Sequence, residues 1–392
     1  VLMLKGALKT ERPTSAAQVL ELIAEAGAAG RRLEVVGGGT KRSVGAVRDA
    51  DAVLSLAKLD KIVDYAPEEL VLTAQPGVKL ADLARLVAAE GQMLPFEPPL
   101  LTRLLGAKGD PTLGGTLAAN LSGPRRIRAG AARDHFLGFE AVTGRGEAVK
   151  AGGKVVMNVT GYELSKLMAG SWGTLAVLTE VTIKVLPAAR TELTLLFFGL
   201  DDAKACTVMA RAMNAPVELS GAAHLPRATA IRAPLKSEMA VTALRLEGFA
   251  ASVATRAEGL AVALQTFGRC AQLDAEHSRE FWAQVREAEA LHRDGRPLWR
   301  ISVPPALGWR VADGLAGDAL YDWAGGLVWL LSDEDPARVR SVALALGGHA
   351  DCWRGHAPAF EPLGGPLAVL SARVKAAFDP NGVLNPGRMG EG

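Results

Sequence analysis

The first ~185 residues alternate short apolar runs with segments of helical periodicity. Ser15-Ala16-Ala17-Gln18 predicts a capping box with Ser15 as the N-cap, and the apolar positions that follow are spaced for a helix that Gly27 would end. Residues 33–36 predict a strand that runs directly into a glycine-rich loop. Residues 70–75 and 80–87 repeat this order of strand, turn and helix, with Pro76-Gly77 as the turn. If the two strands are neighbours, both loops open on the same side.

The second half of the chain has a different order of predicted strands and helices. The β-branched run of residues 178–185 predicts a strand, and the following Pro187 ends the first domain. Beyond it, strands predicted over 193–198, 239–246 and 327–331 alternate with Ala-rich helices, which is typical of a sheet covered on one face. We therefore predict an α+β protein with a first domain over 1–187, a smaller α/β cap over 188–365, and a tail over 366–392 that holds a helix at 368–378.

Composition excludes several classes of protein. The 392 residues are 49% hydrophobic and 22% charged, which is typical of a globular chain of about two domains. No uninterrupted apolar stretch is long enough to span a membrane, and nothing near the start is typical of a secretion signal. We expect a cytoplasmic protein. With 44 basic and 42 acidic side chains, it carries no electrostatic footprint for nucleic acid.

The cysteines limit the redox chemistry that the chain could perform alone. Cys206, Cys270 and Cys352 are odd in number and far apart, so they predict neither a disulfide framework nor an iron–sulfur cluster. Any electron that leaves this chain therefore needs another carrier.

The glycine-rich loop over residues 37–41 is the first candidate binding element. Consecutive amides without Cβ crowding can curl into a nest for phosphate oxygens, and Lys41 and Arg42 add positive charge. The loop is not a Rossmann fingerprint, because Arg42 stands where the third glycine would be. It is not a Walker loop either, because no Gly-Lys-Ser/Thr follows it.

Three further segments are rich in small residues. Residues 109–120 would let the backbone approach a bulky planar ligand, and residues 122–134 continue that loop. Residues 158–162 then precede residues 170–175, where Gly170, Gly173 and Thr174 are candidate donors to a ligand.

In their order and spacing, these segments resemble the vanillyl-alcohol-oxidase (PCMH-type) FAD-binding family. The resemblance rests on the glycine loop, Gln75-Pro76-Gly77-Val78, Pro111-Thr112-Leu113-Gly114-Gly115, Arg133-Asp134, Gly170-Ser171-Trp172-Gly173-Thr174-Leu175 and Asn385-Pro386-Gly387-Arg388. Trp172, the short cap and the segment 298–302 are most similar to the FAD-binding E subunits of bacterial glycolate oxidases. The resemblance covers essentially the whole chain, and the cap contributes least to it.

The resemblance implies a set of FAD-binding residues. Those expected around the pyrophosphate are Val36, Gly37, Gly38, Gly39, Thr40, Lys41, Pro76 and Gly77. Those expected along the flavin and its ribityl chain are Pro111, Thr112, Leu113, Gly114, Gly115, Ala118, Ser122 and Arg133. Gly170, Thr174 and Val177 would wrap the adenosine half, and Asn385 would lie near the isoalloxazine ring.

The resemblance also implies how the cofactor is held and what the chain does. Family members that attach FAD covalently place a His or Cys beside the flavin. Here the glycine loop carries Thr40, and all three cysteines follow Pro187, so we expect noncovalent FAD. The implied function is that of the FAD subunit of a glycolate oxidase complex, which oxidises 2-hydroxy acids to 2-oxo acids. Its implied partners are a catalytic flavoprotein subunit and an iron–sulfur subunit, through which the chain could associate peripherally with a membrane.

Two residues are candidates for catalysis. Arg300 lies in an apolar strand, where either a carboxylate neighbour in an ion pair, the reading we favour, or a bound anion must compensate its charge. His135 follows Arg133-Asp134 and could approach the flavin, although a hydrogen-bonded structural histidine is the simpler interpretation. Only His349, Cys352 and His356 approach metal-ligand spacing, and we interpret them as structural, so no metal is predicted.

Two other functions stay open. A self-sufficient FAD-dependent 2-hydroxy acid or alcohol dehydrogenase would need a base and a cation in the cap that face the flavin. A noncatalytic scaffold would use the flavin only to order its fold.

Overall fold

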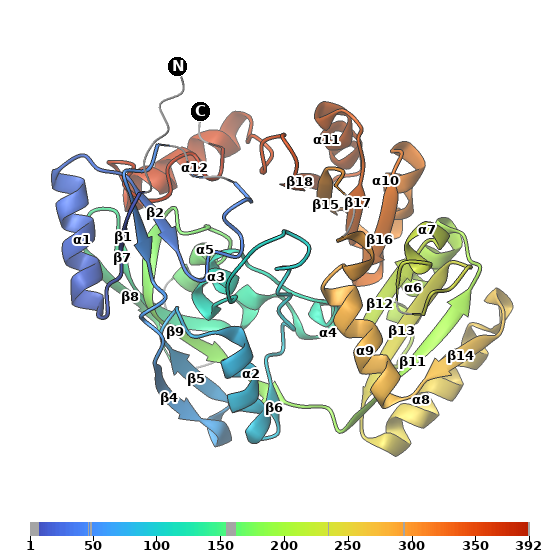
Figure 1. Ribbon diagram of the computed structural model, residues 1–392. Helices are drawn as coiled ribbons and strands as arrows, with labels where there is room; N and C mark the ends of the chain where they lie inside the picture. Colours follow the sequence, from blue (N-terminus) through green and yellow to red (C-terminus); the bar gives the residue numbers. More distant parts are fainter. Residues whose placement is uncertain are drawn as a thin grey trace.

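The computed structural model describes residues 8–45, 47, 49–153, 162–233, 235–292 and 295–390. They form two lobes, joined at one edge by the connection from β10 to β11 (Figure 1). The first lobe contains the strands up to Pro187 together with the tail over 365–390, and the cap lobe contains the strands from Thr191 to Arg354. The strands of the two lobes fall on either side of Pro187, where the sequence places the first boundary. The division into domains itself stays a prediction. No helix in the described ranges has the length and apolar character to cross a bilayer. The segment 158–161, noted in the sequence, lies outside the described residues.

A small parallel sheet opens the first lobe. It has the order β1 (Lys9–Glu11), β3 (Ala52–Ser55), β2 (Leu33–Val36), and α1 (Ala16–Ala28) packs beside it. The predicted N-cap is confirmed, because the Ser15 side chain accepts a hydrogen bond from the amide of Gln18. The reciprocal bond differs from a capping box, since the Gln18 side chain accepts from the Thr14 amide.

A five-stranded antiparallel sheet forms the body of the first lobe. Its order is β4 (Ile62–Ala66), β5 (Val71–Ala74), β9 (Ala176–Lys184), β7 (Phe136–Thr143), β8 (Ala148–Gly152). The helices α2 (Leu80–Ala89), α3 (Leu113–Ala118) and α5 (Leu164–Met168) share its apolar core. A two-stranded ribbon of β6 (Gln92–Met93) and β10 (Leu186–Pro187) closes the lobe at the connection to the cap.

The two repeated strand-loop units do not lie in one sheet. β2 belongs to the three-stranded sheet and β5 to the five-stranded sheet, so the two strands are not neighbours within one sheet. Their loops nevertheless meet, because Pro76 and residues 37–42 line the same cleft. The packing of two sheets against each other, rather than adjacency within one, brings the loops together.

The cap lobe is built on an eight-stranded antiparallel sheet. Its order is β14 (Cys270–Leu273), β11 (Thr191–Phe198), β13 (Val241–Gly248), β12 (Leu219–Leu225), β16 (Asp318–Asp322), β17 (Leu327–Leu331), β15 (Leu298–Ser302), β18 (His349–Arg354). Every pairing described in this sheet is antiparallel, so the cap is α+β rather than the predicted α/β.

Both faces of the cap sheet are covered, not one. The outer face packs against α6 (Asp202–Asn214), α8 (Ala250–Ala263), α10 (Trp309–Gly314) and α11 (Pro336–Ala345). The inner face packs against α9 (Ala275–Arg286) and against first-lobe residues that include Leu101, Leu104 and Trp172. Because side chains alternate along a strand, Arg300 shares the inner face with Leu298 of β15.

The remaining short elements are α4 (Arg126–Ala129), α7 (Arg227–Ala230), and the 3-10 turns η1 (Pro67–Glu69), η2 (Ala132–His135), η3 (Gln265–Phe267), η4 (Glu289–Leu291), η5 (Pro305–Leu307) and η6 (Trp323–Gly325).

A buried ionic network joins the lobes. The Arg245 guanidinium of β13 donates two hydrogen bonds of 2.9 Å to the Glu97 carboxylate of the first lobe, and the Arg245 side chain is 1% exposed. Arg125 donates to Glu247 at 3.0 and 2.6 Å in the opposite direction, from the first lobe to the cap. Burial alone would raise the pKa of Glu97, but Arg245 and Arg125 lower it to about 2. The orientation of the cap over the first lobe is therefore fixed by paired, desolvated charges.

The tail returns to the first lobe. α12 (Gly365–Phe378) lies over that lobe (Figure 1), and it begins three residues before the predicted start of the tail helix. After it, Asp379 accepts bonds from the amides of Val383 and Leu384, and Leu384 forms a parallel bridge with Leu33. The tail is thus a structural part of the sheet that carries the glycine loop.

The interlobe network yields a stability prediction. Glu97→Gln leaves the Arg245 guanidinium buried without an anionic partner, so the free energy of unfolding in urea should fall by about 3–5 kcal/mol. Since the folded state holds the Glu97 pKa at about 2, this contribution is present above the ordinary carboxyl pKa and declines as pH falls toward 2.

The matched control is Glu140→Gln. Glu140 pairs with Lys150 at 2.7 Å, but both side chains are exposed, so its loss should cost less than about 1 kcal/mol. Equal losses in the two variants would contradict a stabilising role for the buried network.

Candidate functional site

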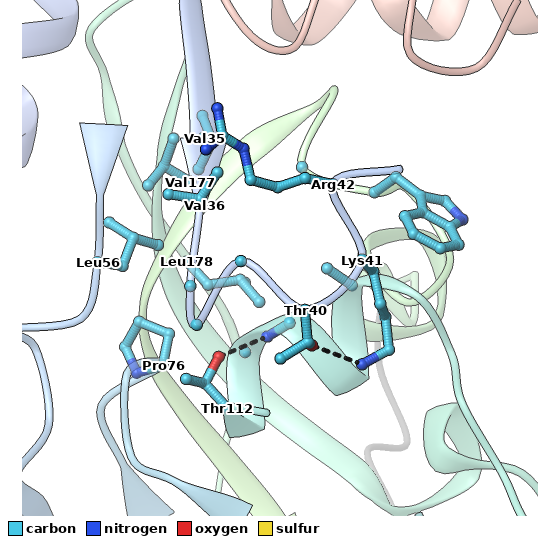
Figure 2. A pocket seen from close by; sticks show the side chains of 18 of the residues that line it. Val35, Val36, Thr40, Lys41, Arg42, Leu56, Pro76, Thr112, Val177 and Leu178 are labelled. Atoms are coloured by element: carbon cyan, nitrogen blue, oxygen red, sulfur yellow. Dashed lines mark hydrogen bonds between the residues drawn. The ribbon is translucent and has the colours of Figure 1, made fainter. Parts of the chain in front are cut away.

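A cleft in the first lobe collects the loops that the sequence singled out. It has an empty volume of about 740 Å³ and lies between the loop after β2, the turn after β5 and the start of α3 (Figure 2). The residues predicted to bind the cofactor that line it are Val36, Gly37, Gly38, Gly39, Thr40, Lys41, Pro76, Thr112, Gly114, Gly115, Ala118 and Val177. Residues 37–41 and 111–115 thus meet around one cavity, as the cofactor interpretation requires.

The three loops approach each other closely enough to require glycine. A Cβ at Gly38 would lie 1.6 Å from the carbonyl oxygen of Asp110, and one at Gly37 would lie 2.3 Å from Oγ1 of Thr112. A Cβ at Gly114 would lie 2.4 Å from the Cβ of Pro76. Any side chain at these positions would push the loops apart and widen the cleft.

The amides of the glycine loop are without acceptors in the protein. No backbone N–H of residues 37–42 donates a hydrogen bond to another described residue. In contrast, the amides at the start of α3 are used: Leu113 donates to the Val78 carbonyl, Gly114 to the Pro76 carbonyl and Gly115 to the Thr112 hydroxyl. The run of consecutive free amides in the cleft therefore belongs to the loop after β2, and such a run favours an anion.

Lys41 brings an uncompensated charge to the cleft. Its side chain is 8% exposed, and Nζ donates to the Thr40 hydroxyl at 3.1 Å (Figure 2). Burial lowers the pKa of Lys41 to about 8, although the charge of Glu287 partly opposes this. No carboxylate oxygen of a described residue lies within 4.0 Å of Nζ.

Arg388 of the tail is the second uncompensated cation. One of its Nη atoms donates to the Lys41 carbonyl at 2.8 Å, whereas its buried Nε has no acceptor among the described residues. Burial lowers the pKa of Arg388 to about 10. Arg42, by comparison, is neutralised by Glu34 in a bidentate pair. The cleft therefore holds an excess of positive charge from Lys41 and Arg388, which a diphosphate fits.

Trp172 forms a wall of the cleft in an unusual backbone conformation. Its φ of 52° is held by a 2.9 Å bond from its amide to the Ala118 carbonyl and a 2.8 Å bond from the Asn385 side chain to its carbonyl. Asn385 also accepts a 2.7 Å bond from the amide of Val35. The tail asparagine thus ties the two walls of the cleft together, and Arg388 packs 5.2 Å from the Trp172 ring.

The other predicted cofactor residues lie outside the cleft lining. They are held by bonds within the protein: Gly77 donates to the Leu59 carbonyl, Leu113 is fully buried, and the amide of Leu80 donates to the carbonyl of Pro111. The hydroxyls of Ser122 and Thr174 are bonded to Ala132 and Ser171, the Gly170 amide donates to Leu117, and the Arg133 side chain is half exposed. Their roles in binding, like that of Asn385, stay predictions.

Several lining residues were absent from the sequence prediction. They are Val35, Leu56, Trp172, Ala176, Leu178 and Arg388, whereas Arg42 and Gly173, which the sequence had singled out, also line the cleft. Arg388 stands three residues after Asn385 in the motif Asn385-Pro386-Gly387-Arg388, so the sequence could have indicated that it also lies near the cofactor. Leu56 and Ala176 are apolar residues at strand ends, and nothing in the sequence distinguishes them from residues of the core.

His135 is a structural residue by its contacts. One ring nitrogen lies 2.8 Å from the Ala129 carbonyl, the ring stacks on Phe96 at 6.1 Å, and burial lowers its pKa. It lies outside the cleft lining, so a catalytic role for His135 stays a prediction without a supporting contact.

Arg300 lies in an aromatic cage rather than in an ion pair. Its Cζ is 5.1, 6.0 and 5.9 Å from the rings of Trp323, Trp329 and Trp353. Asp351 pairs with it in register across β15 and β18, but no described carboxylate oxygen lies within 4.0 Å of the guanidinium. The expected ion pair is therefore not formed, and the alternative of a bound anion stays open. Among the described residues, no group of three or more His, Cys, Asp or Glu could hold a metal.

Comparison with known proteins agrees with this cleft. A family model described as an FAD binding domain matches residues 9–152. The chain is 37% identical over 330 residues to the glycolate oxidase subunit GlcE of Escherichia coli (strain K12), covering 84% of each chain. It is 35% identical over 157 residues to the glycolate oxidase subunit GlcD of Bacillus subtilis (strain 168), covering 40% of this chain and 32% of that one. The structure of p-cresol methylhydroxylase with substrate bound matches with a TM-score of 0.73 at 15% identity, covering 97% and 88% of the two chains.

The charge of Lys41 predicts how FAD affinity depends on pH. Only the protonated ammonium attracts a diphosphate, and the free protein holds its pKa at about 8. The Kd for FAD, measured by flavin fluorescence, should be constant below pH 7 and rise toward tenfold per pH unit above pH 8. Lys41→Met should bind more weakly at pH 7 and lose this rise.

The control for this measurement is Lys58→Met. Lys58 is exposed in the loop that carries Leu56, so its loss should leave both the affinity and the pH profile unchanged. A profile that persists in Lys41→Met would assign the dependence to another group.

Proposed function

The chain belongs to the vanillyl-alcohol-oxidase (PCMH-type) family of FAD-binding oxidoreductases, and from that premise we propose that it is the FAD-binding subunit of a cytoplasmic glycolate oxidase complex. The observation that carries the proposal is the likeness to GlcE, which extends over most of both chains rather than over the FAD domain alone. In this proposal the complex oxidises 2-hydroxy acids to 2-oxo acids. Its other members are a catalytic flavoprotein subunit and an iron–sulfur subunit.

FAD, when bound, supplies the acceptor for the hydride that leaves the carbon bearing the hydroxyl group. The residues of this chain bind and orient it. The free amides of residues 37–42, with Lys41 and Arg388, hold the diphosphate. Thr112, Gly114 and Ala118 line the cleft from α3, and Val177 lines it from β9. Glycine at the loop contacts keeps the walls close enough to exclude water from the diphosphate.

We propose noncovalent attachment of the cofactor. The described residues that line the cleft include no His, Cys or Tyr, so none offers an imidazole, thiol or phenol for a covalent bond to the flavin. Cys206, Cys270 and Cys352 belong to α6, β14 and β18 of the cap. His135, which lies in the first lobe, bonds to the Ala129 carbonyl instead.

The electron balance supports the proposal of partner subunits. Oxidation of a hydroxy acid leaves two electrons on the cofactor, and they must be passed on before the next turnover. The three cysteines are distributed over three elements of the cap, so they do not form a cluster that could accept these electrons. A separate subunit with an iron–sulfur centre provides the missing acceptor.

A second candidate is a dehydrogenase that works without partners. Arg300 favours it, because an unpaired cation on the inner face of the cap is suited to the carboxylate of a hydroxy acid. The proposal that the chain is a noncatalytic scaffold ordered by its flavin has no contact in its favour beyond the FAD cleft itself.

Anaerobic reduction separates these candidates. We expect that glycolate or D-lactate bleaches the flavin absorbance near 450 nm only after the partner subunits are added. Bleaching with the purified chain alone would instead establish the self-sufficient dehydrogenase. Absence of flavin turnover with and without partners, in a complex that oxidises glycolate, would establish the scaffold.

Denaturation tests the mode of attachment. Because no His, Cys or Tyr is among the described residues that line the cleft, acid precipitation should leave the yellow colour in the supernatant. Absorbance scans of supernatant and redissolved pellet measure the partition. A yellow pellet would show a covalent bond.

A further inference from the structure

Two arginines from different lobes meet at one tryptophan. Arg126 of α4, in the first lobe, lies with its Cζ 4.2 Å from the Trp323 ring centroid. Arg300 of β15, in the cap, lies 5.1 Å from the same centroid. Trp323 is buried, and its Nε1 donates a 3.0 Å bond to the Gly123 carbonyl, which fixes the ring between the lobes.

Neither guanidinium has a hydrogen-bond acceptor among the residues that the structure describes. No side-chain hydrogen bond or ion pair joins Arg126 or Arg300 to another described residue. Burial lowers the pKa of Arg300 to about 10, and the charge of Arg126 lowers it further, while Asp351 and Asp322 oppose this from a distance. Burial likewise lowers the pKa of Arg126, and Arg133 adds to that effect. The charge of Arg126 therefore adds to the cost of burying the charge of Arg300.

Stacking on tryptophan does not supply the hydrogen-bond acceptors that the two guanidinium groups lack. A cation–π contact offsets part of the cost of desolvating a guanidinium. It supplies no acceptor, however, for the N–H groups at the edge of the guanidinium plane. Both arginines are only partly buried, so these edges remain reachable for a ligand.

A third donor without an acceptor belongs to the same cage. Nε1 of Trp353 is buried and has no acceptor among the described residues, and the Trp353 side chain is 2% exposed. Its ring lies 5.9 Å from the Arg300 guanidinium and 5.9 Å from the ring of Trp172, which lines the cofactor cleft. The cage is thus separated from the cleft by a single layer of aromatic side chains.

We propose that Arg126, Arg300 and Trp353 bind the carboxylate of the small organic acid that the complex uses. A carboxylate offers planar acceptors that match a guanidinium edge, and its charge compensates the two cations. Because one arginine comes from each lobe, the site exists only when the cap is docked. This inference rests on the proposed function, since it assigns the anionic group of that substrate.

Binding of oxalate tests the site without catalysis. Oxalate has the carboxylate chemistry but no C–H bond to oxidise, and isothermal titration calorimetry on the FAD-loaded protein measures its Kd. Arg126→Gln and Arg300→Gln should each weaken binding by about ten- to a hundredfold, as expected for the loss of a charged hydrogen-bond donor. Trp353→Phe keeps the ring and removes the N–H, so it should weaken binding by a smaller factor of about threefold to tenfold.

The matched control is Arg128→Gln. Arg128 also belongs to α4, but it is exposed and pairs with Glu218 at 2.6 Å, so oxalate affinity should not change. If Arg300→Gln does not fold, Arg126→Gln and Trp353→Phe still decide the matter. Wild-type affinity in Arg126→Gln and Trp353→Phe, or failure of the native protein to bind oxalate, would overturn the site.

The same variants separate this inference from the proposed function. If glycolate reduces the flavin of Arg126→Gln and Arg300→Gln at the wild-type rate with partners present, the carboxylate site is wrong and the function stands. If oxalate binding depends on these arginines but no hydroxy acid reduces the flavin with partners, the proposed function is wrong and the anion site stands.

Discussion

The carboxylate of Glu97 determines how the two lobes face each other. It accepts both Nη bonds of Arg245 in the cap sheet and a bond from the backbone amide of Arg125, just before α4. Its neighbour Phe96 accepts a bond from the amide of Gly123, whose own carbonyl accepts from the Trp323 indole. One buried anion thus sets the position of α4, of β13 and of the aromatic cage, and the relation between Arg126 and Arg300 follows from it.

Against this background, the uncompensated cations are informative. Several other deeply buried charges are paired: Asp379 bonds to Lys375, and Glu247 bonds to Arg125. Lys41 and Arg388 in the cleft, and Arg126 and Arg300 at the lobe boundary, lack such carboxylate contacts in the described part of the chain. Desolvating a cation without a counterion is costly, so a fold that keeps four of them in two places has those places adapted to anions.

Features set by local chemistry could be predicted from the sequence. The Ser15 cap, the strand over 33–36 and the glycine loop depend on neighbours within a few residues, and the structure has them where they were expected. Features set by contacts distant in sequence could not. The separation of β2 and β5 into two sheets, the use of Arg388 against the Lys41 carbonyl, and the cage around Arg300 each join segments remote from one another. For Arg300, the apolar strand indicated that its charge needs compensation, but not by what.

The tail bears on how the protein matures in the cell. Val35 and Trp172, on two walls of the cleft, are bonded through Asn385, and the sheet that carries the glycine loop gains a bridge only at Leu384. These residues emerge from the ribosome after both lobes have been synthesised. A nascent chain therefore lacks a finished cleft until Leu384, Asn385 and Arg388 have emerged.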